Sequence, residues 1–337
     1  MQVYRHNERF ELEKGEALQT VDIAYHTWGT LNEERDNVIW ICHALTADSN
    51  ARDWWPGMIG EGLVFDPKDY FIVCANMLGS CYGTTGPATI NPQTNTPYFH
   101  RFPFLTIRDM VRTHDLLRLH LGISGIYLLV GGSMGGYQAL EWAVMQPSLF
   151  KRLFLLATSP KESAWGIAIH TAQRNAIALD PSWHEETEAA GKDGLKVARA
   201  IGMITYRSYD TFAKMQTDTD EEKVDDFKAS SYINYQGAKL ANRFSAYSYW
   251  TLTKALDTHN LARDRGEITD VLKSVAADTL IIGITSDLLC PIQEQKTMAE
   301  HIPHATFVAI DSIYGHDGFL VETKTISQHL SAWLKQS

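Results

Sequence analysis

The stretch YLLVGGSMGGYQALEWAVM, residues 127–145, decides the fold of this 337-residue chain. An apolar run at 127–130 leads into a glycine-rich turn around Ser133, and a helix-forming run follows up to Met145. A G-x-S-x-G pattern between a strand and a helix is typical of a sharp turn that exposes the serine hydroxyl at the carboxyl edge of a sheet. Glycines let strand and helix approach closely, and the helix N-terminus favours a developing negative charge. We therefore expect Ser133 to be a nucleophile.

Further short apolar runs lie on both sides of this stretch. They cover residues 38–42, 70–75, 153–157 and 279–284, with a weaker run at 306–310. Continuous apolar runs are typical of parallel strands that are covered on both faces. Residues 21–27 alternate instead, which predicts a half-buried strand. Helical patterns at 106–121 and 135–145 separate the runs, so the chain is expected to form an α/β fold with a doubly wound, mostly parallel sheet.

Residues 161–269 lack this alternation of strands and helices. The segment has no convincing strand, is rich in Ala, Lys, Glu and Asp, and contains helical patterns at 194–206 and 247–256. The strand pattern resumes at Thr279, but two final strands alone would form a sheet of little independent stability. We therefore expect one α/β core made of residues 1–160 and 270–337, with residues 161–269 inserted as a helical lid.

Bulk composition excludes several classes of protein. The formal charge is −10, from 30 basic and 40 acidic residues, so nucleic acid is not an expected partner. The first ten residues lack the profile of a signal peptide, and no apolar run reaches the roughly 18 residues of a membrane span. The four cysteines form no CxxC pair and no zinc-site spacing with histidines. We expect a cytoplasmic protein without metal or membrane contact.

A nucleophilic serine needs a general base and an acid that orients it. After this kind of turn, in the α/β-hydrolase fold, the chain order is serine, then Asp or Glu, then histidine. Asp287 follows the expected strand at 279–284, and His316 follows the one at 306–310. Loops at the carboxyl ends of strands are where ligands bind in open α/β sheets. We expect His316 to take the Ser133 proton and Asp287 to stabilise the imidazolium.

Other histidines and acids are weaker candidates for the same roles. The rival histidines lie in the expected lid, in helices or at the opposite sheet edge: His170, His184, His259, His301, His304 and His329. Asp278 precedes its strand, and Asp311 is a weaker alternative to Asp287. The oxyanion hole requires two N–H donors, for which we expect Met134, after the nucleophile, and Leu45, in the loop after residues 38–42.

The triad alone is compatible with esterase, lipase, thioesterase, peptidase or acyltransferase activity, and the fold does not choose among them. Six segments narrow the choice because together they resemble the homoserine O-acetyltransferase family. They are HALTADSN (43–50), NMLGSCYGTTGP (76–87), GGSMGGYQALEWA (131–143), GLKVARAIGMITYRS (194–208), SDLLCP (286–291) and YGHDGFLVE (314–322). The sequence departs from the family pattern at Tyr137, Cys290 and Thr84, where Met, Phe and Ser are usual.

The resemblance implies a ping-pong transfer of an acetyl group from acetyl-CoA to the hydroxyl of L-homoserine, in methionine biosynthesis. Acetyl-CoA is then a co-substrate, and no cofactor is expected. The substrate contacts implied are Arg199, for the homoserine carboxylate, Tyr206, and Asp317, for the ammonium group. The resemblance also implies a homodimer. A homoserine O-succinyltransferase, a serine O-acyltransferase and an α/β-hydrolase esterase stay open as alternatives, although a plain esterase has no need for Arg199 and Asp317 together.

Overall fold

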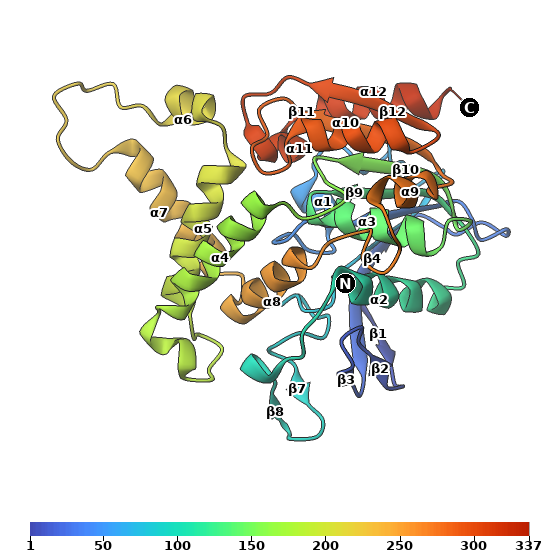
Figure 1. The fold of residues 1–337 in the computed structure, drawn as a ribbon, viewed down its shortest axis with the longest axis horizontal. Helices are drawn as coiled ribbons and strands as arrows, with labels where there is room; N and C mark the ends of the chain where they lie inside the picture. Colours follow the sequence, from blue (N-terminus) through green and yellow to red (C-terminus); the bar gives the residue numbers. More distant parts are fainter. Residues whose placement is uncertain (337) are drawn as a thin grey trace.

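A computed structural model describes residues 1–336, which fold around one eight-stranded sheet (Figure 1). The strand order is β1-β4-β6-β5-β9-β10-β11-β12. The strands are β1 (Gln2–His6), β4 (Val21–Trp28), β5 (Val38–Cys42), β6 (Phe71–Ala75), β9 (Ile126–Gly132), β10 (Phe150–Leu156), β11 (Asp278–Ile284) and β12 (Ala305–Ile310). β4 pairs antiparallel with β1 and with β6, and every other pair is parallel. The expectation of a mostly parallel sheet is confirmed.

Helices cover this sheet and fill the interval between β10 and β11. The helices and 3-10 turns are α1 (Ala51–Trp54), η1 (Phe99–Arg101), α2 (Ile107–His120), α3 (Met134–Met145), α4 (Ala164–Ala178), η2 (Pro181–His184), α5 (Lys192–Tyr206), α6 (Tyr209–Gln216), α7 (Lys228–Ala241), α8 (Ala246–Asp257), α9 (Ile268–Lys273), α10 (Ile292–His301), η3 (Gly315–Asp317), α11 (Gly318–Val321) and α12 (Thr323–Leu334). Two small hairpins, β2–β3 (Phe10–Glu11, Ala17–Leu18) and β7–β8 (Ile90–Asn91, Thr96–Pro97), complete the described elements.

The central strand β5 shows why the strand sequences are continuously apolar. Val38, Trp40 and Cys42 pack into the hydrophobic cluster on one face of the sheet. Ile39 and Ile41 pack into the cluster on the other face, and all five side chains are buried. Because both faces are covered, no position along the strand is left for a polar side chain.

Helices α4–α8 lie together beside the sheet, and α6 and α7 project farthest from it (Figure 1, yellow and light orange). α5 packs against both α4 and α7, and α4 also contacts α8. Within the described residues between β10 and β11, the only β pairing is an isolated bridge from Lys161 to Asn260. The helical patterns at 194–206 and 247–256 form α5 and α8.

Strand β1 was not predicted. It lies at the edge of the sheet, and its side chains are exposed or half-buried, so its sequence carries no apolar pattern. Its pairing is reinforced instead by an ion pair with β4, in which Arg5 Nε lies 2.6 Å from Asp22 Oδ1. An exposed edge strand need not alternate hydrophobic and polar residues, so the hydrophobic pattern of the sequence does not reveal it.

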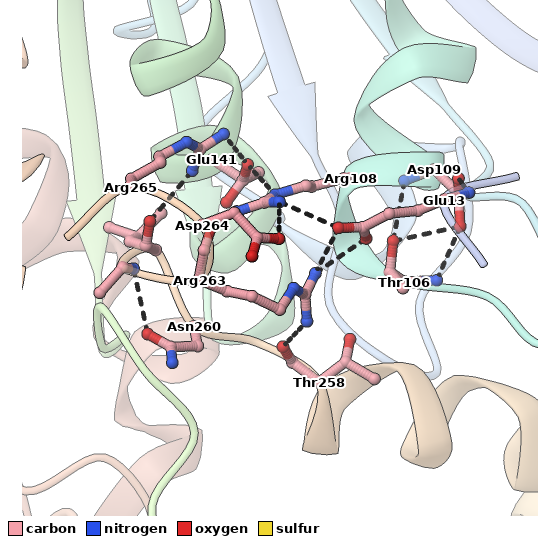
Figure 2. Close-up of polar contacts among 12 residues, drawn as sticks. Glu13, Thr106, Arg108, Asp109, Glu141, Thr258, Asn260, Arg263, Asp264 and Arg265 are labelled. Carbon is pink, nitrogen blue, oxygen red and sulfur yellow. Dashed lines mark hydrogen bonds and ion pairs between the residues drawn. The ribbon is translucent and has the colours of Figure 1, made fainter.

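A network of ion pairs fastens the end of the inserted segment to the core (Figure 2). Glu141 on α3 is 2% exposed and accepts hydrogen bonds from Arg108 on α2, at 3.0 Å, and from Arg265. Glu13 accepts from Arg108, at 2.9 Å, and from Arg263, at 2.8 Å. The chain that leaves α8 is therefore held against α2 and α3. Of these, α3 is the helix that begins at the glycine-rich turn.

Candidate active site

Ser133 lies at the sharp turn between β9 and α3, with φ 54° and ψ −127°. A residue other than glycine at such a φ is strained, and this strain is typical of a nucleophile turn. The neighbouring glycines are required for space. A Cβ atom on Gly131 would lie 2.2 Å from the carbonyl oxygen of Gly135, and one on Gly135 would lie 2.0 Å from that of Cys42. The turn holds the serine at the carboxyl edge of the sheet.

The structure brings Ser133, His316 and Asp287 into one hydrogen-bonded chain. His316 Nε2 lies 2.8 Å from Ser133 Oγ, and His316 Nδ1 lies 2.7 Å from Asp287 Oδ2. The other carboxylate oxygen of Asp287 accepts the backbone N–H groups of Leu289 and Cys290, at 2.8 and 2.9 Å. His316 and Asp287 are buried. This arrangement can move a proton from the serine hydroxyl to the imidazole and hold the resulting charge.

Burial and charge act in opposite directions on His316. Burial disfavours the imidazolium, but the attraction and hydrogen bond of Asp287 outweigh it and raise the pKa of His316 above its ordinary value of 6.5. Asp317 and Glu162 add to this effect. A base with a raised pKa accepts a proton more readily from a weak acid such as a serine hydroxyl.

Donor atoms of Asp287, Cys290 and His316 lie within 4.8 Å of one another, a grouping that could hold a metal ion. Both ring nitrogens of His316 are already in hydrogen bonds, to Asp287 and to Ser133. Burial also raises the pKa of the Cys290 thiol well above its usual range, which disfavours the thiolate that a metal needs. The geometry is therefore that of a proton relay.

A cavity of about 640 Å³ opens over Ser133. Its lining comes from the core and from the inserted helices: Ala44, Leu45, Thr46, Ser133, Met134, Tyr137, Glu162, His170, Arg199, Tyr206, Leu256, Leu289, Cys290, His316, Asp317, Phe319 and Leu320. The lining combines apolar walls with a few polar and charged groups, as is typical of small-molecule sites. Every residue that the sequence predicted for the site lines this cavity except Asp287, which lies behind His316.

Leu45 and Met134 line the cavity, and the backbone N–H group of each has no protein acceptor among residues 1–336. Leu45 lies in the turn after β5, and within residues 1–336 its backbone N–H donates to no protein acceptor. Met134 is the first residue of α3, where the N–H groups have no partner within the helix. Two such donors beside the nucleophile suit an oxyanion.

Arg199 on α5 reaches the cavity with an unused donor. Its guanidinium lies 5.2 Å from the centre of the Tyr206 ring, and its Nε is buried without a hydrogen-bond partner among the described residues. The Tyr206 ring lies 6.1 Å from the His316 ring, so the pair is close to the base. A guanidinium with a free N–H in a cavity is suited to an anionic group, above all a carboxylate.

Asp317 is already paired in the structure. Its Oδ2 lies 2.9 Å from Nε of Arg207. Arg207 follows Tyr206 directly in the segment 194–208, but it was not predicted as a site residue. Burial raises the pKa of Asp317, and the charges of Arg207, Arg199 and His316 oppose that rise. The Asp317 carboxylate therefore lies at the cavity in contact with one positively charged side chain, that of Arg207.

Glu162 and His170 also line the cavity and were not predicted there. Glu162 follows β10 by a few residues, so the available signal was an acid just past the carboxyl end of a buried strand. His170 was set aside as a lid residue, but α4 brings it to the cavity wall, where its Nδ1 lies 2.9 Å from Asp257 Oδ1. Helix packing, which the sequence pattern does not encode, determines the second placement.

The three departures from the family pattern lie in different places. Tyr137 and Cys290 line the cavity. Thr84 is buried in a loop instead, where its hydroxyl accepts from the Ala24 N–H at 2.9 Å and donates to the Asn76 carbonyl at 2.8 Å. Only the first two can touch a substrate.

The rival histidines other than His170 and the rival acids lie outside the cavity. His259 is buried, stacks on the Tyr137 ring at 4.0 Å and bonds to the Ser159 carbonyl, and burial lowers its pKa to about 3. Asp278 and Asp311 are exposed on the surface. Within the described chain, His316 is the imidazole in contact with Ser133.

The fold and the serine site define the class of this protein, an enzyme of the α/β-hydrolase fold. The family described as "alpha/beta hydrolase fold" matches residues 37–323. A homoserine O-acetyltransferase from Cyclobacterium marinum is 45% identical over 332 residues, covering 98% of this chain and 94% of that protein. The chain belongs to the homoserine O-acetyltransferase family.

Solved structures of two activities share this fold. The homoserine O-acetyltransferase from Bacillus anthracis superposes with a TM-score of 0.90 at 27% identity, over 100% of this chain and 99% of that one. The L374D mutant of esterase E22 superposes with a TM-score of 0.88 at 25% identity, over 98% of each chain. The architecture alone therefore does not separate transfer from hydrolysis. Among residues 1–336, no helix has the length and apolarity needed to cross a membrane.

Proposed function

We propose that this enzyme transfers an acetyl group from acetyl-CoA to the hydroxyl of L-homoserine, a step of methionine biosynthesis. The observation that carries the proposal is Arg199 in the cavity that holds Ser133, because its buried Nε has no hydrogen-bond partner among residues 1–336. An acyl acceptor that carries a carboxylate can use this group, whereas water cannot. The similarity to proteins named homoserine O-acetyltransferase supports the same acceptor and acyl group.

In the first half-reaction, Ser133 Oγ attacks the thioester carbonyl while its proton passes to His316 Nε2. Asp287 stabilises the imidazolium, and the N–H groups of Leu45 and Met134 donate hydrogen bonds to the negatively charged carbonyl oxygen. The carbon–sulfur bond then breaks. The sulfur leaves with the proton from His316 as free CoA, and the acetyl group stays on Ser133.

In the second half-reaction, homoserine replaces CoA in the cavity. Arg199 binds its carboxylate and Asp317 its ammonium group, which places the acceptor hydroxyl near His316. His316 takes the hydroxyl proton, the oxygen attacks the acetyl carbon, and Ser133 recovers its proton as the acyl bond to it breaks. The inserted helices exclude water, which would otherwise compete for the acyl group.

Three other reactions use the same triad: transfer from succinyl-CoA, transfer to L-serine, and ester hydrolysis. The similarity to esterase E22 makes hydrolysis the second candidate. The test is an activity matrix of acetyl-CoA and succinyl-CoA against L-homoserine, L-serine and water, with products identified by mass spectrometry. We expect O-acetylhomoserine to form fastest. The proposal would be contradicted if acetate were released at the same rate with and without homoserine and no O-acetylhomoserine formed.

We also propose a cytoplasmic homodimer. Large apolar side chains lie exposed on α5, α6 and α7: Val197, Ile204, Tyr209, Met215 and Tyr235. Contiguous exposed apolar surface is typical of a protein interface. Light scattering coupled to size exclusion tests this, and a monomer at micromolar concentration would contradict it.

A further inference from the structure

Glu162 places a carboxyl group on the wall of the catalytic cavity that the proposed reaction does not use. The side chain is 6% exposed and lines the cavity together with Ser133. Its Oε2 accepts the Tyr137 hydroxyl at 3.1 Å, and its Oε1 accepts the Ser163 N–H at 2.9 Å. Within the described residues, no arginine, lysine or histidine forms an ion pair with it. Its charge is therefore not neutralised by direct contact.

The position of Glu162 links it to the nucleophile. Tyr137, which donates to Glu162, lies on α3, the helix that begins directly after Ser133. Glu162 is also close enough to His316 for its negative charge to contribute to the raised pKa of that base. An acyl group on Ser133 therefore occupies a cavity whose wall carries this carboxyl.

Among residues 1–336, no free positive charge is in contact with Glu162, and Arg199, in the same cavity, is assigned to the acceptor carboxylate in the proposed reaction. His170, also in the cavity, holds Asp257 at 2.9 Å, and Asp257 is shared with Arg174. Glu294 lies behind the wall, bonded to Ser159, and lines a separate surface cleft that Glu162 also borders. Burial raises the pKa of Glu162 and of Glu294, and the charge of His170 opposes the rise for Glu162.

We propose that Glu162 selects the acyl group, rejecting acyl chains that end in a carboxylate and admitting short uncharged ones such as acetyl. The proposal rests on the proposed acyl-transfer function. Two carboxyl groups in one desolvated site cannot both ionise without cost, so a terminal carboxylate such as that of a succinyl chain is disfavoured whichever of the two holds the proton. Specificity then comes from a repulsive element as well as an attractive one.

The test measures acylation of Ser133 by intact-protein mass spectrometry, without any acceptor. Acetyl-CoA, butyryl-CoA and succinyl-CoA are compared, because butyryl matches succinyl in carbon number without its charge. We expect the wild type to form the butyryl adduct faster than the succinyl adduct. Glu162→Gln keeps the size of the side chain and its acceptor for Tyr137, and it should lower the butyryl-to-succinyl ratio by roughly tenfold or more.

Two variants serve as controls. Glu162→Asp keeps the charge and should keep a ratio that favours butyryl. Glu294→Gln removes a nearby half-buried carboxyl that borders the outer cleft but not the catalytic cavity, and its ratio should stay within about twofold of the wild type. Circular dichroism establishes that each variant is folded. The wild type alone offers a further comparison, since the methyl ester of succinyl-CoA has no charge on its acyl chain and should acylate Ser133 faster than succinyl-CoA.

An unchanged ratio in folded Glu162→Gln, or equal acylation by succinyl-CoA and its methyl ester, overturns the proposal. A raised KM for homoserine with an unchanged donor ratio also overturns it, because the carboxyl would then recognise the acceptor. The acylation assay is run without an acceptor. Failure of transfer to homoserine would therefore overturn the proposed function, but the donor ratios would still test the role of Glu162.

Discussion

His316 Nε2 lies 2.8 Å from Ser133 Oγ, although 183 positions separate the two residues in the chain. They meet because β9 and β12 belong to the same run of parallel strands and so end at the same edge of the sheet. Asp287, after β11, completes the chain at this edge. Parallel strand topology, and not sequence proximity, assembles the proton relay.

Ser133→Ala should abolish acylation, because the Oγ atom that forms the covalent bond is removed. We expect kcat to fall by a factor on the order of 10⁶, as for loss of a triad nucleophile. Mass spectrometry after mixing with acetyl-CoA should show no adduct. Ser148→Ala, at an exposed serine, is the control and should acylate normally. Continued turnover in Ser133→Ala would show that Ser133 is not the nucleophile.

The acid limb of the pH profile should reflect His316. The base must be neutral to take a proton, and Asp287 raises its pKa above 6.5, so kcat/KM should fall as the pH drops through a value above 6.5. Asp287→Asn removes the attraction, so the limb should move to lower pH, and kcat should drop by about 10⁴. A wild-type limb that lies below 6.5 would contradict this assignment.

Arg199 should act on the acceptor more than on the donor. Arg199→Ala removes the charge and the N–H donors of the guanidinium, and we expect the KM for homoserine to rise by roughly 30-fold or more. Arg199→Lys keeps the charge but loses the planar fork, so its effect should be smaller. Pre-steady-state kinetics separates acylation by acetyl-CoA from deacylation by homoserine. An equal loss in both half-reactions would argue that Arg199 is structural.

Glu141 should be important for stability, not for chemistry. It is buried between Arg108 and Arg265, so Glu141→Gln leaves the mostly buried Arg265 without its carboxylate and removes one of the carboxylates that hold Arg108 (Figure 2). We expect the free energy of unfolding to fall by about 3 kcal/mol, measured by urea denaturation. Asp264→Asn is the matched control, because Asp264 is 82% exposed and pairs with Arg108 only at 3.7 Å. Its effect should stay below about 1 kcal/mol, and equal losses in the two variants would refute the role of burial.

Much of the site could be predicted from the sequence because its signals are local or follow from chain order. The glycines around Ser133 are needed for the turn itself, so they appear beside the serine in the sequence. Asp287 could be chosen because it follows the buried strand β11, and His316 because it follows the weaker apolar run that forms the edge strand β12. Leu45 and Met134 follow from the same reasoning, since each comes directly after a strand or after the nucleophile.

The tertiary structure alone decided which side chains of the insertion join the site besides Arg199 and Tyr206, which the family resemblance implied. Arg207 pairs with Asp317, and Glu162 and His170 join the cavity wall, only because α4 and α5 fold over the sheet edge. A helix pattern gives the face of a helix but not the neighbour against which that face packs. The sequence by itself therefore determined the serine, its base and its acid, whereas packing of the insertion decided that Glu162, His170 and Arg207 add their charges to the site.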